Sequence, residues 1–259
     1  MRDAVTTALL DVDEITVRFG GIVALDRLSF SIREGDICGL IGPNGAGKTT
    51  LFNVVSRIYE PTRGSVAFDG RNLLAVPAHG IARAGVARTF QNLALFPTQN
   101  VLENVVVGAT STAKVNWITA ALRIGAKKED QALRERSGSI LRELGLERYA
   151  LHPAAGLPYG TLKRIEIARA MAARPRLLLL DEPASGLTHS EVDQLADVIR
   201  KLRETHGLTV LLVEHHMQMV MGISDQIVVL NFGKKIADGT PAEIARDPAV
   251  IEAYLGSEM

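Results

Sequence analysis

The chain has 259 residues, 47% of them hydrophobic, which suffices for one large domain or two small ones with a buried core. Its 29 Lys and Arg residues balance 29 Asp and Glu residues, and the resulting zero net charge argues against binding nucleic acid or an anionic membrane by bulk charge. Cys38 is the only cysteine, so an intrachain disulfide is excluded. Its apolar surroundings favour a buried position, and a reducing compartment is expected.

Neither a signal peptide nor a membrane span is expected. The N-terminal stretch MRDAVTTALLDVDEI carries acidic residues where a signal peptide needs an unbroken apolar core. No apolar run approaches the ~18 residues needed to cross a bilayer. The sequence therefore predicts a soluble protein of the cytoplasm.

The first part of the chain is rich in short strands. The pattern predicts strands at 14–19, 28–32 and 36–41, a helix at 48–57 and a strand at 64–70. Residues 98–157 have a helix-forming composition and no convincing strand. We therefore expect a helical insertion there.

Helices and apolar strands alternate after the insertion. The expected order is helix 162–173, strand 176–182, helix 190–204, strand 208–214, a helix at about 215–222, strand 226–231 and a C-terminal helix at 247–256. The three strands are continuous apolar runs, which are typical of a parallel sheet buried on both faces. The alternation predicts an α/β core with right-handed crossovers.

The stretch GLIGPNGAGKTT, residues 39–50, joins a predicted strand to a predicted helix. Gly42 is followed after four residues by Gly47, Lys48 and Thr49, which is the spacing of a phosphate-binding loop. Glycines let backbone N–H groups surround phosphate oxygens, Lys48 reaches the β- and γ-phosphates, and the Thr49 hydroxyl binds Mg²⁺. A merely structural Gly-rich turn is the alternative. The spacing and its flanks favour a nucleotide site.

Two adjacent carboxylates end the strand at 176–182. Asp181 and Glu182 lie at the carboxyl edge of the predicted sheet, where α/β folds bind ligands. Successive residues at a strand end point in different directions, so Asp181 can hold the Mg²⁺ shell while Glu182 polarises water toward the γ-phosphate. A solvated turn is the alternative, and the phosphate loop in the same domain favours catalysis.

Three further polar residues are candidates for sensing the γ-phosphate. His215 follows strand 208–214, and its neutral imidazole can donate one hydrogen bond; His216 is equally eligible on this ground. Gln91 lies where the core meets the helical insertion, where its amide can contact Mg²⁺ or water. Without further context, such residues are more often ordinary polar surface residues.

A Gly- and Pro-containing turn precedes helix 162–173. The stretch AAGLPYGTLKR, residues 154–164, places Lys163 and Arg164 in the first turns of that helix, where the helix dipole prefers anions. The turn is either a surface loop with solvated cations or a corner that meets an anionic ligand.

These motifs occur together in a familiar order. GPNGAGKT, RTFQN, LPYGTLKRIEIARA, LLLLDEPASGL and LVEHHM resemble the ATP-binding subunits of ABC transporters, and the likeness extends from Phe19 to the C-terminal IEAYLG. Within that family the chain is most similar to the importer ATPases for branched-chain amino acids, with urea and amide importers close behind. The grounds are VRFGGIVALD, RTFQNLALFPTQNVLENV, the insertion after Val107, LVEHHMQMVMGISDQIVVLNFGKKIADGTPAEI and the final AYLG.

The resemblance implies an α/β fold: a P-loop NTPase core with a mainly parallel sheet, an N-terminal antiparallel β subdomain and an inserted helical subdomain. It implies one ABC ATPase domain over residues 1–259. The core would comprise 1–97 and 158–240, the helical subdomain 98–157 and a C-terminal helical tail 241–259.

The resemblance also assigns roles to individual residues. Phe19 would stack on adenine, Gln91 would be the Q-loop residue, Glu182 the catalytic base, and His215 rather than His216 the switch histidine. The ATP-binding residues would be Phe19, Gly42, Asn44, Gly45, Gly47, Lys48, Thr49 and Thr50, and the Mg²⁺ ligands Thr49, Gln91 and Asp181. The D-loop would comprise Ser185, Gly186 and Thr188.

The family's signature turn, usually LSGGQ, falls on residues 157–161 as LPYGT. Pro158 replaces a serine whose hydroxyl faces the γ-phosphate, Tyr159 replaces a glycine, and Thr161 replaces a glutamine but can restore a hydroxyl. Gly160 and the helix N-terminus remain to meet an anion. Thr188 stands where Asp is most frequent, which puts hydrogen bonds between subunits at the D-loop in doubt.

The resemblance implies an ATP-hydrolysing motor for a membrane importer. The signature turn would contact ATP bound to another subunit, so two chains facing head to tail would bury two ATP molecules. Expected partners are transmembrane permease subunits, an identical or related ATPase subunit and, indirectly, a solute-binding protein; no nucleic acid is expected. The location would be peripheral, on the cytoplasmic face of the cell membrane. The alternatives are a soluble ABC ATPase of DNA repair or translation and a P-loop kinase or GTPase, which would leave the signature turn and His215 unexplained.

Overall fold

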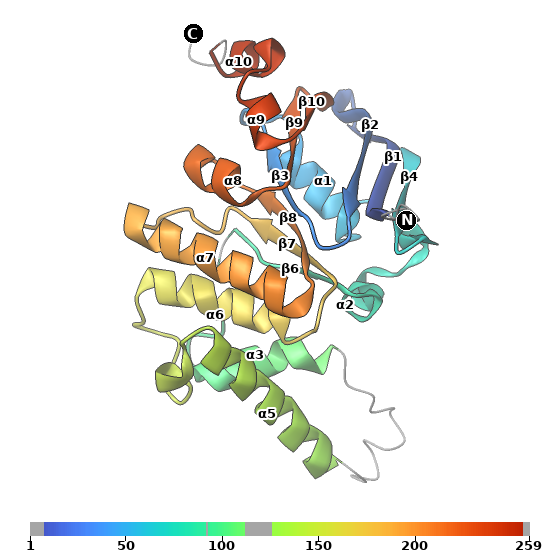
Figure 1. Ribbon diagram of the computed structural model, residues 1–259. Helices are drawn as coiled ribbons and strands as arrows, with labels where there is room; N and C mark the ends of the chain where they lie inside the picture. The colour runs from blue at the N-terminus through green and yellow to red at the C-terminus, as the bar shows by residue number, and fades with distance from the viewer. Residues whose placement is uncertain (1–7, 92, 112–125, 256–259) are drawn as a thin grey trace, which may run out of the picture.

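The computed structural model describes residues 8–91, 93–111 and 126–255 (Figure 1). Residues 112–125 of the predicted helical insertion and residues 256–259 of the predicted tail lie outside the described part, as does Asn92. The strands form two sheets, and helices cover the larger one. The predicted fold class, an α/β protein with a mainly parallel sheet, an antiparallel N-terminal sheet and an inserted helical segment, is confirmed.

The first sheet is antiparallel and consists of β2, β1, β4 and β5 in that order. Its strands are β1 (Ala8–Phe19), β2 (Ile22–Arg33), β4 (Arg63–Phe68) and β5 (Arg71–Asn72). The sequence predicted only the ends of β1 and β2, at 14–19 and 28–32. Register shifts interrupt the pairing of these two strands, and Glu14 has φ 51°, so bulges break the regular alternation on which a strand prediction depends.

The second sheet contains six strands in the order β10-β9-β3-β8-β7-β6. They are β3 (Ile37–Ile41), β6 (Val86–Arg88), β7 (Leu177–Asp181), β8 (Thr209–Val213), β9 (Gln226–Asn231) and β10 (Lys234–Gly239). All pairs are parallel except β9 with β10. The sequence analysis missed β6 and β10, because β6 has only three residues and β10 is an edge strand without a buried residue.

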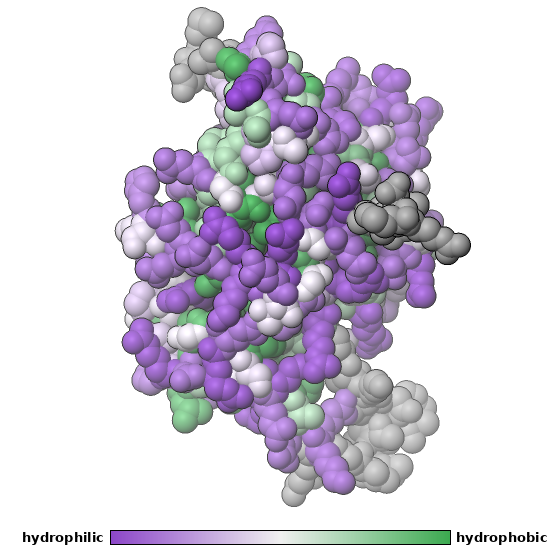
Figure 2. Space-filling model, viewed as in Figure 1, coloured by the Kyte–Doolittle hydropathy of each residue, from purple (hydrophilic) through white to green (hydrophobic). Residues whose placement is uncertain are grey.

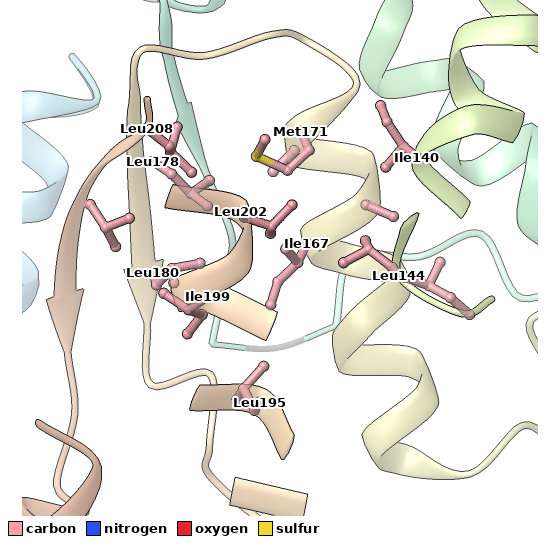
Figure 3. Packing of buried hydrophobic residues seen from close by; sticks show 14 of the residues in the cluster. Ile140, Leu144, Ile167, Met171, Leu178, Leu180, Leu195, Ile199, Leu202 and Leu208 are labelled. Atoms are coloured by element: carbon pink, nitrogen blue, oxygen red, sulfur yellow. The ribbon is translucent and has the colours of Figure 1, made fainter. Parts of the chain in front are cut away.

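Each central strand is buried on both faces. In β7, Leu177 and Leu179 join the core between the two sheets and α1 (Lys48–Val55). Leu178 and Leu180 face the opposite core, against α6 (Tyr159–Met171) and α7 (His189–His206), as Figure 3 shows. This two-sided burial explains the unbroken run of leucines.

The remaining helices cover the sheet or extend from it. They are α2 (Ile81–Ala84), α3 (Val101–Thr110), α5 (Ala126–Glu143), α8 (Met217–Ile223), α9 (Pro241–Ile244) and α10 (Pro248–Leu255), with short 3₁₀ turns at Leu73–Ala75, Ala78–Gly80 and Glu147–Tyr149. α3 and α5 pack beside α6 at one end of the molecule (Figure 1). Gly108 allows the close approach of α3 to α6, because a Cβ there would collide with the Arg169 carbonyl oxygen.

Among the described residues, no helix is both long and apolar enough to span a bilayer. The face drawn in Figure 2 is mostly hydrophilic, with apolar residues visible in small areas between polar ones. Cys38 is fully buried in β3, as its apolar surroundings predicted, and burial raises the pKa of its thiol.

Candidate nucleotide site

The predicted phosphate loop connects β3 to α1. Gly42, Gly45 and Gly47 have φ values of 149°, 80° and 101°, which side chains with a Cβ rarely adopt. A Cβ on Gly47 would also lie 2.7 Å from the Ala24 carbonyl oxygen. Gly47 caps α1 without a side-chain hydrogen bond, so the first N–H groups of this helix remain directed at the loop. The loop thus has the geometry of an anion site.

Lys48 closes the loop on itself. Its Nζ donates hydrogen bonds to the carbonyl oxygens of Gly42, at 2.6 Å, and Pro43, at 2.9 Å. The residue is 7% exposed, and burial lowers the pKa of the ammonium. The negative charges of Glu182 and Asp181 partly offset this by raising the pKa. A buried ammonium needs negative charge nearby, which a phosphate would supply.

Asp181 ends β7 and is held by an arginine that sequence reasoning missed. Arg88 of β6 pairs with Asp181 at 2.8 Å, and both side chains are nearly buried. The same guanidinium donates to Asn53 Oδ1 at 2.7 Å and Ser56 Oγ at 2.9 Å, both belonging to or directly following α1. Arg88 therefore ties the helix after the phosphate loop to the carboxylate at the sheet edge.

Replacement of Arg88 tests this tie. We expect Arg88→Met to lower the free energy of unfolding by about 3–5 kcal/mol, because Asp181 would keep a buried charge without its partner. Urea denaturation followed by circular dichroism measures the loss. Arg200→Met removes an exposed pair with Asp197 and should cost below about 1 kcal/mol. Equal losses in the two variants would contradict a structural role for the Arg88 pair.

Glu182 lies between the two predicted sensor residues. His215 Nε2 is 2.7 Å from Glu182 Oε1, and Gln91 Nε2 donates to Glu182 Oε2 at 2.9 Å. The side chain of His215 is 47% exposed, whereas that of Glu182 is 17% exposed. Glu182 also has φ 48°, a left-handed conformation that is strained for a residue with a Cβ. Six other non-glycine residues of the described chain also have a positive φ, so the evidence for a functional role of Glu182 is its contacts with His215 and Gln91.

The structure separates the two adjacent histidines. The predicted helix at 215–222 begins only at Met217, which leaves both histidines in the loop after β8. His216 contacts a different carboxylate, because its Nδ1 lies 3.3 Å from Glu214 Oε2. The fully buried Glu214 was missed by sequence reasoning, although a carboxylate directly after an apolar strand was a visible signal.

Phe19, the predicted adenine platform, ends β1 on the surface. It is 46% exposed, so a purely core role does not fit. Its ring meets the ring of Tyr59 edge to face, with centroids 5.2 Å apart. Tyr59 is itself 37% exposed and was not identified from the sequence. The two rings form an open aromatic surface suited to stacking with a flat base.

Three of the five predicted signature residues, 159–161, belong to a helix rather than to a preceding turn. α6 begins at Tyr159, earlier than the predicted 162, with Pro158 at its N-cap and no side-chain cap. Helix geometry leaves the N–H groups of Tyr159 and Gly160 without intrahelical acceptors. Thr161 is 5% exposed, so little of its hydroxyl is accessible. Tyr159 packs its ring over Gly186, which accounts for an aromatic residue at this position.

Lys163 does not present its charge to the helix N-terminus, contrary to the sequence-based expectation. It is 2% exposed, and its Nζ donates to the Gln91 carbonyl oxygen at 3.3 Å. Glu166, one turn further on, is equally buried and accepts from the Phe90 N–H at 3.1 Å. Burial raises the pKa of Glu166. Arg169 donates to the Ala94 carbonyl oxygen, so three charged side chains of α6 hold the segment around Gln91.

Thr188 has a clear role within the chain. It is the N-cap of α7 and forms a capping box with Glu191: the Thr188 N–H donates to Glu191 Oε2 at 2.9 Å, and the Glu191 N–H donates to the Thr188 hydroxyl. A Cβ on Gly160 would lie 2.7 Å from Glu191 Oε1. A larger residue at position 160 would therefore require the Glu191 side chain to shift.

The side chains at the carboxyl ends of the strands in the six-stranded sheet fit a magnesium nucleotide. Mg²⁺ prefers oxygen ligands, which the Thr49 hydroxyl, the Asp181 carboxylate and the Gln91 amide oxygen would provide. The phosphate loop supplies N–H groups and the Lys48 ammonium for phosphates, and the Phe19–Tyr59 pair supplies a surface for a base.

Comparisons with known proteins agree with this geometry. The "ABC transporter" family model matches residues 25–185, and the model "Branched-chain amino acid ATP-binding cassette transporter" matches residues 234–259. The chain is 44% identical over 249 residues to the high-affinity branched-chain amino acid transport ATP-binding protein BraF of Pseudomonas aeruginosa, covering 96% of this chain and 98% of that protein. It is 42% identical over 250 residues to LivG of Escherichia coli K12, with the same coverage.

Solved structures of ATP-binding cassettes share the fold. The ADP conformation of MJ1267, an ATP-binding cassette of an ABC transporter, aligns with a TM-score of 0.85 and 29% identity over 97% of this chain and 100% of that chain. A dimeric post-hydrolysis state of the cassette MJ0796, bound to ADP and phosphate, aligns with a TM-score of 0.76 and 25% identity over 90% and 98% of the two chains. The family model covers most of the chain and the curated relatives nearly all of it, so this protein belongs to the ABC transporter family as an ATP-binding subunit.

Proposed function

We propose that this chain hydrolyses ATP to drive a membrane importer of branched-chain amino acids. The observation that carries the proposal is the full-length likeness to BraF and LivG, both described as branched-chain amino acid transport ATP-binding proteins. The match of residues 234–259 to the branched-chain amino acid model supports the same substrate class. The chain would lie on the cytoplasmic face of the membrane, bound to permease subunits that receive solute from a binding protein.

The proposed hydrolysis uses the residues at the carboxyl edge of the sheet. Lys48 and the N–H groups of the phosphate loop hold the phosphates, and Phe19 stacks on adenine. Bound Mg²⁺ would neutralise charge that develops on the β- and γ-phosphate oxygens. Glu182 orients the attacking water and takes up its proton, and His215, hydrogen-bonded to Glu182, places its imidazole next to the γ-phosphate.

The second half of each site would come from a partner cassette. The uncapped N-terminus of α6 can donate its free N–H groups to an anion, and Pro158 contributes no hydroxyl there. We propose that residues 158–161 contact ATP bound to the partner, with Ser185, Gly186 and Thr188 at the same interface. Dimeric cassette structures in the family support this arrangement.

The permease contact is assigned to the helical subdomain, 98–157, and the loop leading into it. Phe90 and Phe96 are 42% and 45% exposed on either side of Gln91 and its neighbours, a pair of exposed rings that a membrane subunit would cover. Because Gln91 contacts Glu182, a partner docked here would affect the catalytic residues directly.

Crosslinking tests the proposed function. We expect Phe96→Cys, treated with a thiol-specific bifunctional reagent in native membranes, to capture a transmembrane permease subunit. The buried Cys38 leaves the new thiol as the reactive one. Ile22→Cys, 71% exposed on the antiparallel sheet, serves as the control and should capture no permease. Capture of ribosomal or DNA-associated proteins instead would favour a soluble ABC ATPase. The solute is tested separately: deletion of the gene for this chain should abolish uptake of branched-chain amino acids by the cell.

A further inference from the structure

The two loops that carry Glu182 and His215 diverge just after the sheet ends. β7 and β8 pair up to Asp181 and Val213, and the last bond of the ladder joins the Glu182 N–H to the Val213 carbonyl oxygen at 2.9 Å. Beyond this point the chain continues into the D-loop on one side and toward His215 on the other. A further connection is needed to fix the Glu182–His215 distance.

Glu214 makes that connection through its side chain. Its Oε1 accepts from the Ala184 N–H at 2.5 Å, in the loop after Glu182. Its Oε2 accepts from the His215 N–H at 2.9 Å and lies within 3.4 Å of the His216 N–H. One carboxylate thus bonds the backbones of both loops.

Glu214 is buried, so its carboxylate depends on protein hydrogen-bond donors in place of water. The residue is 1% exposed. The contacts of Glu214 differ from those of Glu182. Glu182 contacts the candidate catalytic side chains of Gln91 and His215, whereas Glu214 accepts hydrogen bonds from backbone N–H groups and contacts the His216 ring. Glu214 therefore has no direct access to the reacting atoms.

We infer that Glu214 is a positioning residue, which sets the distance between Glu182 and His215 by holding together the loop that follows β7 and the loop that follows β8. The inference rests on the proposed roles of Glu182 and His215. Both oxygens of Glu214 must accept, because N–H donors face each of them. Glutamine has one acceptor oxygen, so Glu214→Gln would turn an NH₂ group toward a donor and release one of the two loops.

The test is a double-mutant cycle in the full-length chain. Single-turnover hydrolysis of Mg-ATP is measured for the wild type, Glu214→Gln, His215→Ala and the double variant, together with the Kd for Mg-ATP. We expect Glu214→Gln to slow hydrolysis about ten- to a hundredfold, the range expected when a catalytic group is misplaced by about 1 Å. The Kd should stay within about threefold, because the phosphate loop is untouched.

The cycle separates positioning from general structural damage. If Glu214 acts through His215, the double variant should be at most about threefold slower than His215→Ala, since coupled residues are not additive. If the rate reduction in the double variant equals the product of the reductions in the two single variants, the inference is overturned. A wild-type rate for Glu214→Gln would also overturn it. Leu141→Val, at a fully buried position of α5, serves as a destabilised control. An equal slowing in that variant, at an equal fall in Tm, would also overturn it.

Failure of the proposed site is recognised separately. Wild-type rates in both Glu182→Gln and His215→Ala would remove the proposed roles, and the inference would fail with them. Loss of hydrolysis in these two variants combined with a normal rate in Glu214→Gln would overturn the positioning role alone.

Discussion

Lys48→Ala should weaken binding of Mg-ATP by about a hundredfold or more. The substitution removes the buried ammonium that we propose binds the phosphates. Charge-assisted hydrogen bonds contribute about 1.5–3 kcal/mol each, so the loss of two such bonds to phosphate oxygens would cost about 3 kcal/mol or more. The substitution also frees the carbonyl oxygens of Gly42 and Pro43, which Lys48 holds in the loop. Isothermal titration calorimetry with Mg-ATP measures the change in Kd.

Lys234→Ala is the matched control for this prediction. Lys234 is an exposed lysine that pairs with Asp26 at 3.3 Å, on the β9–β10 hairpin whose Gly233 bonds to Ala46 of the phosphate loop. Its removal should leave the Kd unchanged within about twofold, because exposed pairs contribute little. An unchanged Kd in Lys48→Ala, with the fold retained, would show that phosphates bind elsewhere.

Glu182→Gln should bind Mg-ATP normally but hydrolyse it at least about a hundredfold more slowly, as expected when a general base is lost. The amide keeps the shape of the side chain and can still meet Gln91 and His215, so the loss is confined to proton uptake. Because ATP is then retained between the cassettes, the variant should accumulate as a dimer. Phosphate release and size-exclusion chromatography in Mg-ATP measure the two effects.

A capping carboxylate outside the proposed interface provides the control for Glu182→Gln. Glu243 forms a capping box with Thr240 at the start of α9, and Glu243→Gln should preserve hydrolysis within about threefold, because glutamine also functions in a capping box. Hydrolysis at the wild-type rate in Glu182→Gln would remove Glu182 from the proposed role. A slow variant that remains monomeric in Mg-ATP would instead argue against closure of two cassettes around the nucleotide.

The sequence predicted the parts of the site that depend on short contiguous motifs. The phosphate loop could be recognised because its glycine spacing reflects one backbone shape, and the structure shows the positive φ angles that this shape requires. β7 could be predicted together with its two carboxylates, because four consecutive leucines require burial on both faces. The family and the fold class followed from these motifs and are confirmed.

The remaining features depend on contacts between distant segments. Arg88 lies 93 positions before Asp181, in a strand too short to produce a pattern. Lys163 was expected to be solvated or to meet an anionic ligand, yet α6 turns it toward the carbonyl oxygen of Gln91. The role of Glu214 depends on the N–H of Ala184, which only the folded sheet brings near. Periodicity and propensity carry no information on such pairings.

The left-handed backbone at Glu182 costs this molecule some stability. A glycine would adopt that conformation without steric cost, whereas a glutamate there lowers the free energy of unfolding by about 1–2 kcal/mol. The free energy of unfolding of most domains is only about 5–15 kcal/mol. Selection for thermal robustness alone would therefore favour losing the carboxylate. Engineering of a heat-resistant version should leave position 182 alone and seek its gains in surface loops and helix ends, where added rigidity does not compete with turnover.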